Sequence, residues 1–310
     1  MSISPGRDGS AIAPGPGTLP GTLYVVATPI GNLADLGERA KAVLGEVDVV
    51  AAEDTRHTRR LLDRHGIPAR LESLHEHNER RRVPGIVFRL REGTSFALVS
   101  DSGTPLVSDP GYLLVRAAAE ANVPIVPIPG PSAFLCALSV SGLPVDRFAF
   151  EGFLPAARGA RDARLEALCD DPRTLVFHEA PHRVVASLEA MGAAFGGARR
   201  IVVARELTKR HESLVRTTLS EAPSGIGKPR GEYVLVVEGR PRTREVPAAA
   251  ERTLDVLLES LPLRQAVDLA ARATGVPRKR MYRLALARRE EGYPGPVEST
   301  GCGPERRDGN

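Results

Sequence analysis

The chain has no tryptophan, and aromatic residues make up only 4% of its 310 residues. A surface on which nucleic-acid bases stack between interleaved aromatic rings is therefore not evident. The three cysteines, Cys136, Cys169 and Cys302, lie far apart and fit neither a metal-binding spacing nor a disulfide framework. No apolar run approaches the length that spans a bilayer, and the first residues lack a secretion signal, so we expect a cytoplasmic protein.

Two common nucleotide-binding loops are also missing. The first predicted strand is followed by Pro29-Ile30-Gly31-Asn32 instead of G-x-G-x-x-G, so a Rossmann oxidoreductase would lack its phosphate-binding turn. The absence of a G-x-x-x-x-G-K-[ST] loop argues against a nucleoside triphosphate hydrolase. His178 and His182 are four residues apart, but Pro181 lies between them, and we expect no metal site.

The net charge of +4 is modest but unevenly distributed. Residues 56–91 contain ten arginines and four acidic residues, which gives +6, and residues 264–289 contain eight basic residues and one acidic residue, which gives +7. Local basic patches of this kind are typical of proteins that bind a phosphate backbone. The alternative is an arginine-rich surface that only faces solvent.

The length, the 42% hydrophobic fraction and the 26% charged fraction indicate a globular protein of about two domains. Strand and helix patterns alternate five times before residue 142, which predicts a mainly parallel sheet with helices on its faces. Two strand patterns then follow each other at 213–217 and 233–237 without a helix between them, which predicts a mixed sheet. We predict a disordered tail (1–20), a first α/β domain (21–142), a second α/β domain that helps form a cleft (143–240), a linker (241–259), a helix-turn-helix-like segment (260–290) and a second disordered tail (291–310).

The segment 261–288 contains two helical patterns separated by Thr274-Gly275-Val276-Pro277. Basic residues gather on the second helical pattern, as in a helix-turn-helix that binds nucleic acid. An ordinary helical hairpin without a nucleic-acid partner is the alternative.

The stretch Ser95–Gly111 combines a buried strand pattern at 96–99 with a loop rich in Asp, Ser, Pro and Gly. Similar Gly/Pro loops follow two other predicted strands, at 28–32 and 129–132. Because the carboxyl ends of parallel strands meet at one edge of a sheet, these loops can line one cleft. A tight turn with Asp and Ser caps is the simpler reading of the first loop.

The motifs TPIGNL, AEDTR, SDSGTPLVSDPG, EAPHR and ARELTK occur in this order between Thr28 and Lys209. In this respect the chain resembles the tetrapyrrole methylase superfamily, and more closely its members that methylate ribosomal RNA. The resemblance implies S-adenosylmethionine as cofactor, bound in a folded conformation between the two α/β domains. The implied cofactor-binding residues are Pro29, Gly31, Asp101, Ser102, Gly103, Thr104, Pro105, Val107, Ser108, Pro131, Ser132, Leu154, Ala180, Ala204 and Tyr233.

The resemblance further implies methylation of the ribose 2′-hydroxyl of a decoding-centre cytidine in 16S rRNA, within the small ribosomal subunit, by a homodimer. A ribose hydroxyl reacts well only when its proton is removed, and Glu179, Glu206 and Lys209 are the candidates for this catalytic role. Each of the three also has a simpler reading as a member of a structural salt bridge. The candidate RNA-binding residues are Arg56, Arg59, Arg60, Arg183, Arg205, Arg278, Lys279 and Arg280.

Two other functions remain open from the sequence. A methylase of the same fold could act on a corrin or siroheme precursor, but AEDTR, EAPHR and the basic tail count against this substrate. A ribosome assembly factor without catalytic activity is disfavoured by the intact Gly/Pro loops.

Overall fold

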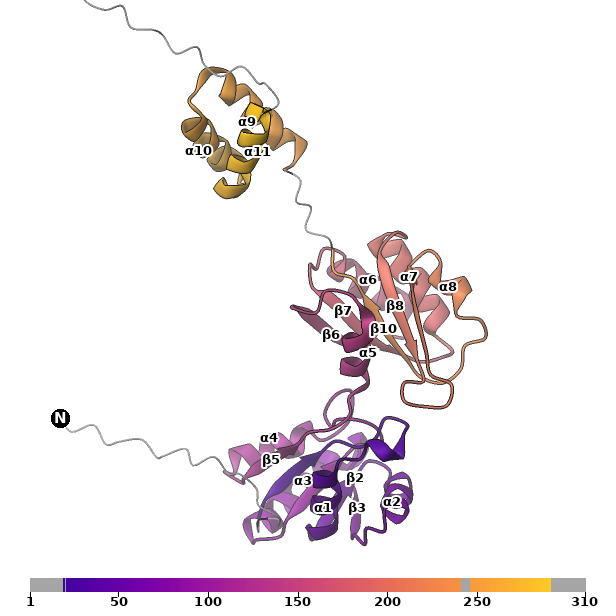
Figure 1. Ribbon diagram of the computed structural model, residues 1–310. Helices are drawn as coiled ribbons and strands as arrows, with labels where there is room; N and C mark the ends of the chain where they lie inside the picture. Colours follow the sequence, from indigo (N-terminus) through magenta and orange to yellow (C-terminus); the bar gives the residue numbers. More distant parts are fainter. Residues whose placement is uncertain (1–18, 20, 241–245, 291–310) are drawn as a thin grey trace, which may run out of the picture. The chain divides into compact units, whose positions relative to one another are not determined.

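The computed structural model describes residues 19, 21–240 and 246–290, with side chains up to residue 288 (Figure 1). The chain divides into a unit that ends at Arg240 and a unit that begins at Pro241. Apart from Leu19, both predicted tails lie outside the described residues, as does Cys302.

The first α/β domain is built on a five-stranded parallel sheet with the order β3-β2-β4-β1-β5. The predicted parallel sheet is confirmed. Its strands are β1 (Leu23–Val26), β2 (Val49–Ala52), β3 (Leu71–Ser73), β4 (Phe96–Val99) and β5 (Ile125–Ile128). The connecting helices are η1 (Leu33–Asp35), α1 (Glu38–Glu46), α2 (Thr55–Arg64), α3 (Glu76–Arg91) and α4 (Tyr112–Glu120).

Both faces of this sheet are buried, which explains why its central strands read as continuous apolar runs instead of alternating patterns. Val50 and Ala97 belong to one core cluster with buried residues of α1 and α2. Val49, Phe96 and Leu98 belong to a second cluster with buried residues of α3 and α4. The sheet thus fixes the carboxyl ends of β1, β4 and β5, from which the Gly/Pro loops emerge.

The second α/β domain has a mixed sheet with the order β6-β7-β10-β8-β9, as predicted. β6 is parallel to β7, β10 is antiparallel to both β7 and β8, and β9 is antiparallel to β8. The strands are β6 (Phe148–Phe153), β7 (Thr174–Glu179), β8 (Arg200–Arg205), β9 (Ser213–Thr218) and β10 (Tyr233–Val237). The helices α6 (Arg158–Leu168), α7 (Val184–Phe195) and the short α8 (Ala222–Gly225) pack on one face; we had predicted no helix between β9 and β10.

Helix α5 (Ala133–Ser141) covers the opposite face of this second sheet. Its Ala137 and Leu138 pack with Val176, Val202 and Val234, so the apolar face that α6 and α7 leave open is buried by α5. The predicted boundary at residue 142 therefore differs from the packing, since the chain passes to the second sheet directly after the loop 129–132.

The second unit contains three helices among its described residues, α9 (Ala248–Ser260), α10 (Leu263–Thr274) and α11 (Arg278–Glu290). The linker predicted for 241–259 is wrong from Ala248 onward, because α9 buries Ala250, Leu254 and Leu258 in a common core with the other two helices. The predicted helical hairpin is α10 and α11, joined through Gly275 in the left-handed conformation. Among the described residues, no helix combines the length and the apolar character that crossing a membrane requires.

Candidate active site

The three Gly/Pro loops of the first domain meet at one edge of the sheet. Thr28 and Gly103 exchange two backbone hydrogen bonds, of 2.9 and 3.1 Å, and the Thr104 hydroxyl donates to the Pro131 carbonyl over 3.1 Å. Gly103 has φ +82°, a conformation that L side chains rarely adopt, and a Cβ there would lie 3.4 Å from Ile30 Cγ2. The expected gathering of these loops is therefore observed.

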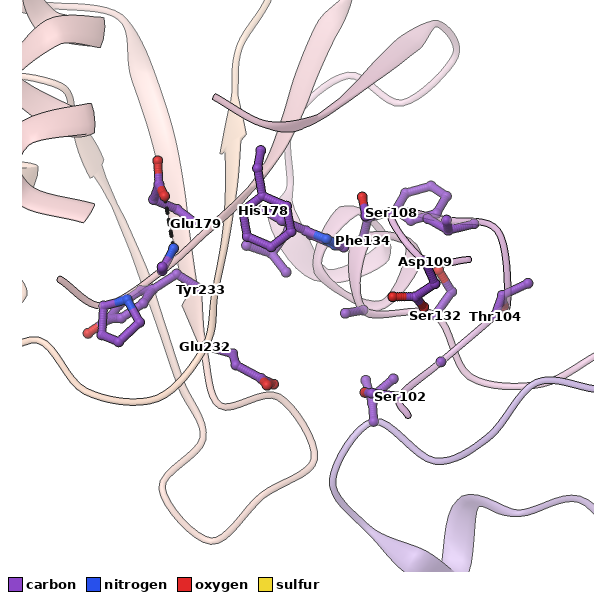
Figure 2. Close-up of a pocket in the computed structure, with 18 residues that line it drawn as sticks. Ser102, Thr104, Ser108, Asp109, Ser132, Phe134, His178, Glu179, Glu232 and Tyr233 are labelled. Atoms are coloured by element: carbon purple, nitrogen blue, oxygen red, sulfur yellow. Dashed lines mark hydrogen bonds between the residues drawn. The ribbon is translucent and has the colours of Figure 1, made fainter. Parts of the chain in front are cut away.

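A cavity of about 280 Å³, which we call the inner cavity, lies between these loops and the second sheet (Figure 2). In Figure 2, Ser102, Thr104, Asp109 and Ser132 lie on one side, and Glu179, Glu232 and Tyr233 lie on the other. Its lining is Ile30, Ser102, Gly103, Thr104, Val107, Ser108, Asp109, Ser132, Ala133, Phe134, Phe153, His178, Glu179, Ala180, Pro181, Glu232, Tyr233 and Val234.

Strained backbone occurs in the loop after β4, which lines this cavity, and in the loop after β8 of the second domain. Of the five described residues other than glycine with positive φ, Leu106 and Ser108 lie in the loop after β4, and Glu206 and Thr208 lie in the loop after β8. Such conformations are costly and tend to occur at functional sites. One loop of each α/β domain therefore has strained backbone.

The inner cavity is acidic. Its acidic lining residues are Asp109, Glu179 and Glu232, its one lining histidine is His178, and no lysine or arginine of the described residues lines it. Glu179 is 2% exposed and accepts hydrogen bonds from the Ser187 hydroxyl and from its neighbouring backbone amide, while Glu232 pairs with a lysine. Asp109 differs from both, because it has no ion pair within the described part of the chain.

The environment of Asp109 favours its protonated form. Burial is the largest cause and the charge of Glu53 the second, and together with Asp101 they raise the pKa of Asp109 to about 6 against a partial opposing effect of Ser100. The pKa of Glu53 is raised as well, by burial and by the charge of Asp101. A cation that entered the cavity would relieve this repulsion.

His178 presents an unused polar atom to the inner cavity. Its Nε2 is buried and has no hydrogen-bond partner among the described residues, and its ring lies edge-on to Phe150 and Phe153 with centroid distances of 5.0 and 5.5 Å. Burial lowers the pKa of His178, with the charge of Glu232 acting in the opposite direction. The imidazole is therefore neutral at neutral pH and can pair with a bound molecule.

A second hollow, which we call the outer groove, consists of two adjoining cavities of about 320 and 740 Å³ that share Gly31, Leu33 and Lys209. It also shares Ile30, Ser102 and Glu232 with the inner cavity. The groove is basic, since its lining includes His57, Arg60, Arg64, His65, Lys209 and Arg210 against Asp101 and Glu232. Within the described part of the chain, Arg60, Arg64 and Arg210 have no hydrogen-bond or ion-pair partner.

Lys209 connects the two domains at the wall of this groove. Its Nζ donates to Glu206 Oε1 over 3.0 Å and to Glu232 Oε2 over 2.8 Å, and its aliphatic chain crosses Gly31, where a Cβ would lie 2.3 Å from Lys209 Cγ. The Asn32 backbone amide also donates to the Thr208 hydroxyl over 3.2 Å. Only glycine at position 31 permits this close approach.

The structure brings together many, but not all, of the residues expected to bind a cofactor. Eight of them line the inner cavity, namely Ser102, Gly103, Thr104, Val107, Ser108, Ser132, Ala180 and Tyr233. Pro29, Gly31 and Asp101 line the outer groove. Pro105, Pro131, Leu154 and Ala204 line neither; Leu154 and Ala204 are buried in the cores of the second domain.

The three candidate catalytic residues have different surroundings. Glu179 lines the inner cavity but has both carboxylate oxygens engaged, and Arg183 Nε lies 3.4 Å from one of them. Burial acts to raise the pKa of Glu206, but hydrogen bonds from Lys209 and a backbone amide outweigh it and lower the pKa. Burial acts to lower the pKa of Lys209, but hydrogen bonds to Glu232 and Glu206 outweigh it and raise the pKa.

Of the arginines expected to bind RNA, Arg60 lines the outer groove. Arg59 instead donates to the Ala69 carbonyl, Arg205 donates to the Arg230 carbonyl, and Arg183 pairs with Glu179 and donates to the Leu154 carbonyl. Arg56 is 88% exposed, beside the Asp54 carboxylate that caps α2. In the second unit, Arg278 pairs with Asp268, Lys279 is exposed and Arg280 is half-buried.

Sequence reasoning missed Asp109, Phe134, His178 and Glu232 as site residues. Of these four, only Asp109 lies in the stretch Ser95–Gly111, where a carboxylate in a Gly/Pro loop indicates a candidate site residue. No group of three or more His, Cys, Asp or Glu side chains that could hold a metal ion occurs in the described part of the chain.

Two family models and many curated proteins match this chain. The family model for tetrapyrrole (corrin/porphyrin) methylases matches residues 22–223, and a model described as the RsmI C-terminal HTH domain matches residues 244–289. The chain is 50% identical over 272 residues to ribosomal RNA small subunit methyltransferase I of Escherichia coli O157:H7, covering 86% of this chain and 95% of that protein. The protein of the same name from Pseudomonas aeruginosa is 50% identical over 275 residues, covering 86% and 98%.

Among solved structures, the uroporphyrin-III C-methyltransferase of Thermus thermophilus complexed with S-adenyl homocysteine has a similar fold. The TM-score is 0.51 with 20% sequence identity, and the match covers 70% of this chain and 97% of that chain.

Proposed function

Because this chain belongs to the family of ribosomal RNA small subunit methyltransferase I, within the tetrapyrrole methylases, we propose that it methylates the ribose 2′-hydroxyl of a decoding-centre cytidine in 16S rRNA. The methyl donor is S-adenosylmethionine. The single observation that supports an RNA substrate is the basic outer groove, which opens directly beside the acidic inner cavity.

The residues of the inner cavity fit S-adenosylmethionine. Ile30, Val107, Phe134 and Val234 supply apolar surface, and hydroxyl groups of the Ser and Thr lining residues supply hydrogen-bonding groups. The buried, unpartnered Nε2 of His178 offers one more polar contact. When bound, the cofactor supplies a methyl group on a positively charged sulfur, which is a strong electrophile.

The outer groove supports the binding of a nucleic-acid strand. Arg60 and Arg64 lie on α2, and Arg210 comes from the loop after β8, so cations from both domains face the same hollow. Their guanidinium groups are not engaged by carboxylates and remain able to form paired hydrogen bonds with phosphate oxygens.

The shared lining of the two hollows supports a common meeting point for the target ribose and the methyl group. Ile30, Ser102 and Glu232 line both the inner cavity and the outer groove. A ribose held at this junction would have its phosphates in the basic groove and its hydroxyl toward the inner cavity, and holding the two reacting atoms in line would supply much of the rate acceleration.

The contacts of Glu206 and Lys209 favour a positioning role over proton transfer. Lys209 is held in its protonated form and Glu206 in its ionised form, so the first has no lone pair to offer and the second is a weak base. We propose that the pair fixes Glu232 and the loop around Gly31 at the junction.

The test is methylation of isolated small ribosomal subunits that lack ribose methylation, with labelled S-adenosylmethionine, followed by nucleoside analysis with mass spectrometry. We expect label in 2′-O-methylcytidine from one decoding-centre position. Label in a base, or label at another site, would contradict the proposal. Comparison with naked 16S rRNA tests whether the assembled subunit is required.

Two further parts of the proposal have their own tests. A cytoplasmic location follows from where 16S rRNA is assembled, and cell fractionation checks it. The expected homodimer remains a prediction, which sedimentation equilibrium of the purified protein tests.

A further inference from the structure

The acidic lining of the inner cavity sets a charge preference for its ligand. Among the described residues, three carboxylates and no lysine or arginine line the cavity. Two of the three are already neutralised or engaged, since Glu232 pairs with Lys209 and Glu179 lies beside Arg183. Asp109 alone has no cation beside it within the described part of the chain.

The surroundings of Asp109 add negative charge instead of removing it. Glu53 at the end of β2 and Asp101 after β4 are the charged groups that face it from its own domain. Across the cavity, the second domain contributes the carboxylates of Glu179 and Glu232 and the neutral imidazole of His178. A positively charged ligand is therefore more favourable here than a neutral one, because Glu53, Asp101 and Asp109 have no ion pair within the described residues.

The two forms of the cofactor differ in this property. S-adenosylmethionine carries a sulfonium charge that its demethylated product, S-adenosylhomocysteine, lacks. Methyl transfer leaves the electron pair of the broken carbon–sulfur bond on sulfur, so the product is a neutral thioether. A carboxylate that lines the cofactor cavity therefore interacts differently with the two.

We infer that the Asp109 carboxylate makes the inner cavity select the sulfonium form of the cofactor over the neutral product. The inference rests on the proposed function only in placing the cofactor in the inner cavity. Loss of the sulfonium charge on methyl transfer then removes an attraction and favours exchange of product for fresh cofactor. The raised pKa of Asp109 supports this role, because a carboxylate under repulsion gains most from a nearby cation.

The test is isothermal titration calorimetry of the full chain with S-adenosylmethionine and S-adenosylhomocysteine, without RNA. For the wild type at about pH 7.5 we expect tighter binding of the sulfonium form. Asp109→Asn should narrow the ratio of the two dissociation constants by on the order of tenfold, as one screened charge interaction allows. Asp109→Glu should keep the ratio even if both affinities fall, and Asp63→Asn, on the exposed surface of α2, controls for net charge.

A pH series provides a second test that needs no variant. As the pH falls below about 6, protonation of Asp109 should narrow the wild-type ratio, and Asp109→Asn should reduce this pH dependence. A wild-type protein without preference, or an Asp109→Asn variant with the wild-type ratio, would overturn the inference. Equal weakening of both ligands in Asp109→Asn would overturn it too, whereas failure of the wild type to bind either ligand would contradict the proposed function itself.

Discussion

Replacement of Arg60 by alanine tests the outer groove as the path of the RNA strand. Arg60 is exposed on α2, lines the groove and has no partner within the described part of the chain. If it contacts a phosphate, Arg60→Ala should weaken binding of the small subunit while the affinity for S-adenosylmethionine stays unchanged, because Arg60 does not line the inner cavity.

The size of the effect follows from the chemistry of the contact. A hydrogen bond to a charged group contributes about 1.5 kcal/mol at the lower end of the usual range, which is roughly tenfold in affinity. Each lysine or arginine contact with a phosphate also contributes about 0.7 to 0.9 to the slope of log K against log salt. A fourfold rise in salt concentration should therefore reduce the ratio of wild-type to Arg60→Ala affinity for the small subunit by about threefold.

The neighbouring arginine provides a matched control. Arg59 lies on the same helix but donates to the Ala69 carbonyl over 3.0 Å and does not line the groove. Arg59→Ala should lower the free energy of unfolding by about 1 kcal/mol and leave the salt slope of subunit binding near the wild-type value. The assay is equilibrium binding of labelled subunits at several salt concentrations, with urea unfolding of both variants.

Two results would refute this reasoning. One is an Arg60→Ala variant with the wild-type salt slope, since no phosphate contact would then have been lost. The other is an equal reduction of the slope by Arg59→Ala, which would show that the overall charge of α2 matters more than the groove.

Three other substitutions probe residues in and next to the lining of the two hollows. Gly31→Ala should displace Lys209 and reduce the methylation rate by on the order of tenfold or more, with cofactor affinity retained by calorimetry. Ser187→Ala leaves a buried oxygen of Glu179 without its hydroxyl donor, and should lower the free energy of unfolding in urea by about 1 to 3 kcal/mol. Asp109 has a folded-state pKa of about 6, above its ordinary 3.8. Its contribution to the stability of the fold is therefore complete below the ordinary pKa and is lost as the pH rises through 6, where the carboxyl group ionises in the folded protein. Asp109→Asn should therefore be more stable than the wild type by about 1 kcal/mol near pH 7.5, with the difference vanishing below about pH 4 in urea titrations.

These three predictions have clear contrary outcomes. An unchanged methylation rate in Gly31→Ala would show that the position of Lys209 does not matter. Ser139→Ala removes an exposed hydroxyl that donates to the Cys136 carbonyl, and a loss of stability as large as that of Ser187→Ala would contradict the burial argument. A stability difference for Asp109→Asn that is the same at both pH values would not originate from the titration of Asp109.

The fold was largely predictable because its central strands β2, β4 and β10 are short and buried on both sides. The apolar run at 96–99 reads as a strand directly, and the alternation of strands and helices leads to a parallel sheet. The packing of α5 was not predictable, since its apolar residues fit either sheet and only the tertiary structure decides between them. Helix α9 was missed because its first residues follow a segment rich in Arg and Pro that resembles a linker.

Local sequence patterns predicted the candidate site only on the side of the first domain, whereas Glu179, Ala180 and Tyr233 of the second domain were expected from the family resemblance. The loop after β4 carries its signal in sequence, with Gly103 and two aspartates close together. His178 and Glu232 reach the inner cavity through the pairing of β7 with β10, in which His178 lies opposite Val234, and no local pattern contains that register. The division of the α2 arginines into an engaged Arg59 and an available Arg60 likewise depends on contacts distant in sequence.

The most direct test of the central claim is a cryo-electron microscopy structure of this protein bound to the small ribosomal subunit with sinefungin, a non-reactive cationic analogue of the cofactor. We predict the analogue in the inner cavity, phosphates along the outer groove, and the target ribose at the junction lined by Ile30, Ser102 and Glu232. An analogue bound in the outer groove, or RNA that reaches the inner cavity without passing Arg60 and Arg64, would contradict it.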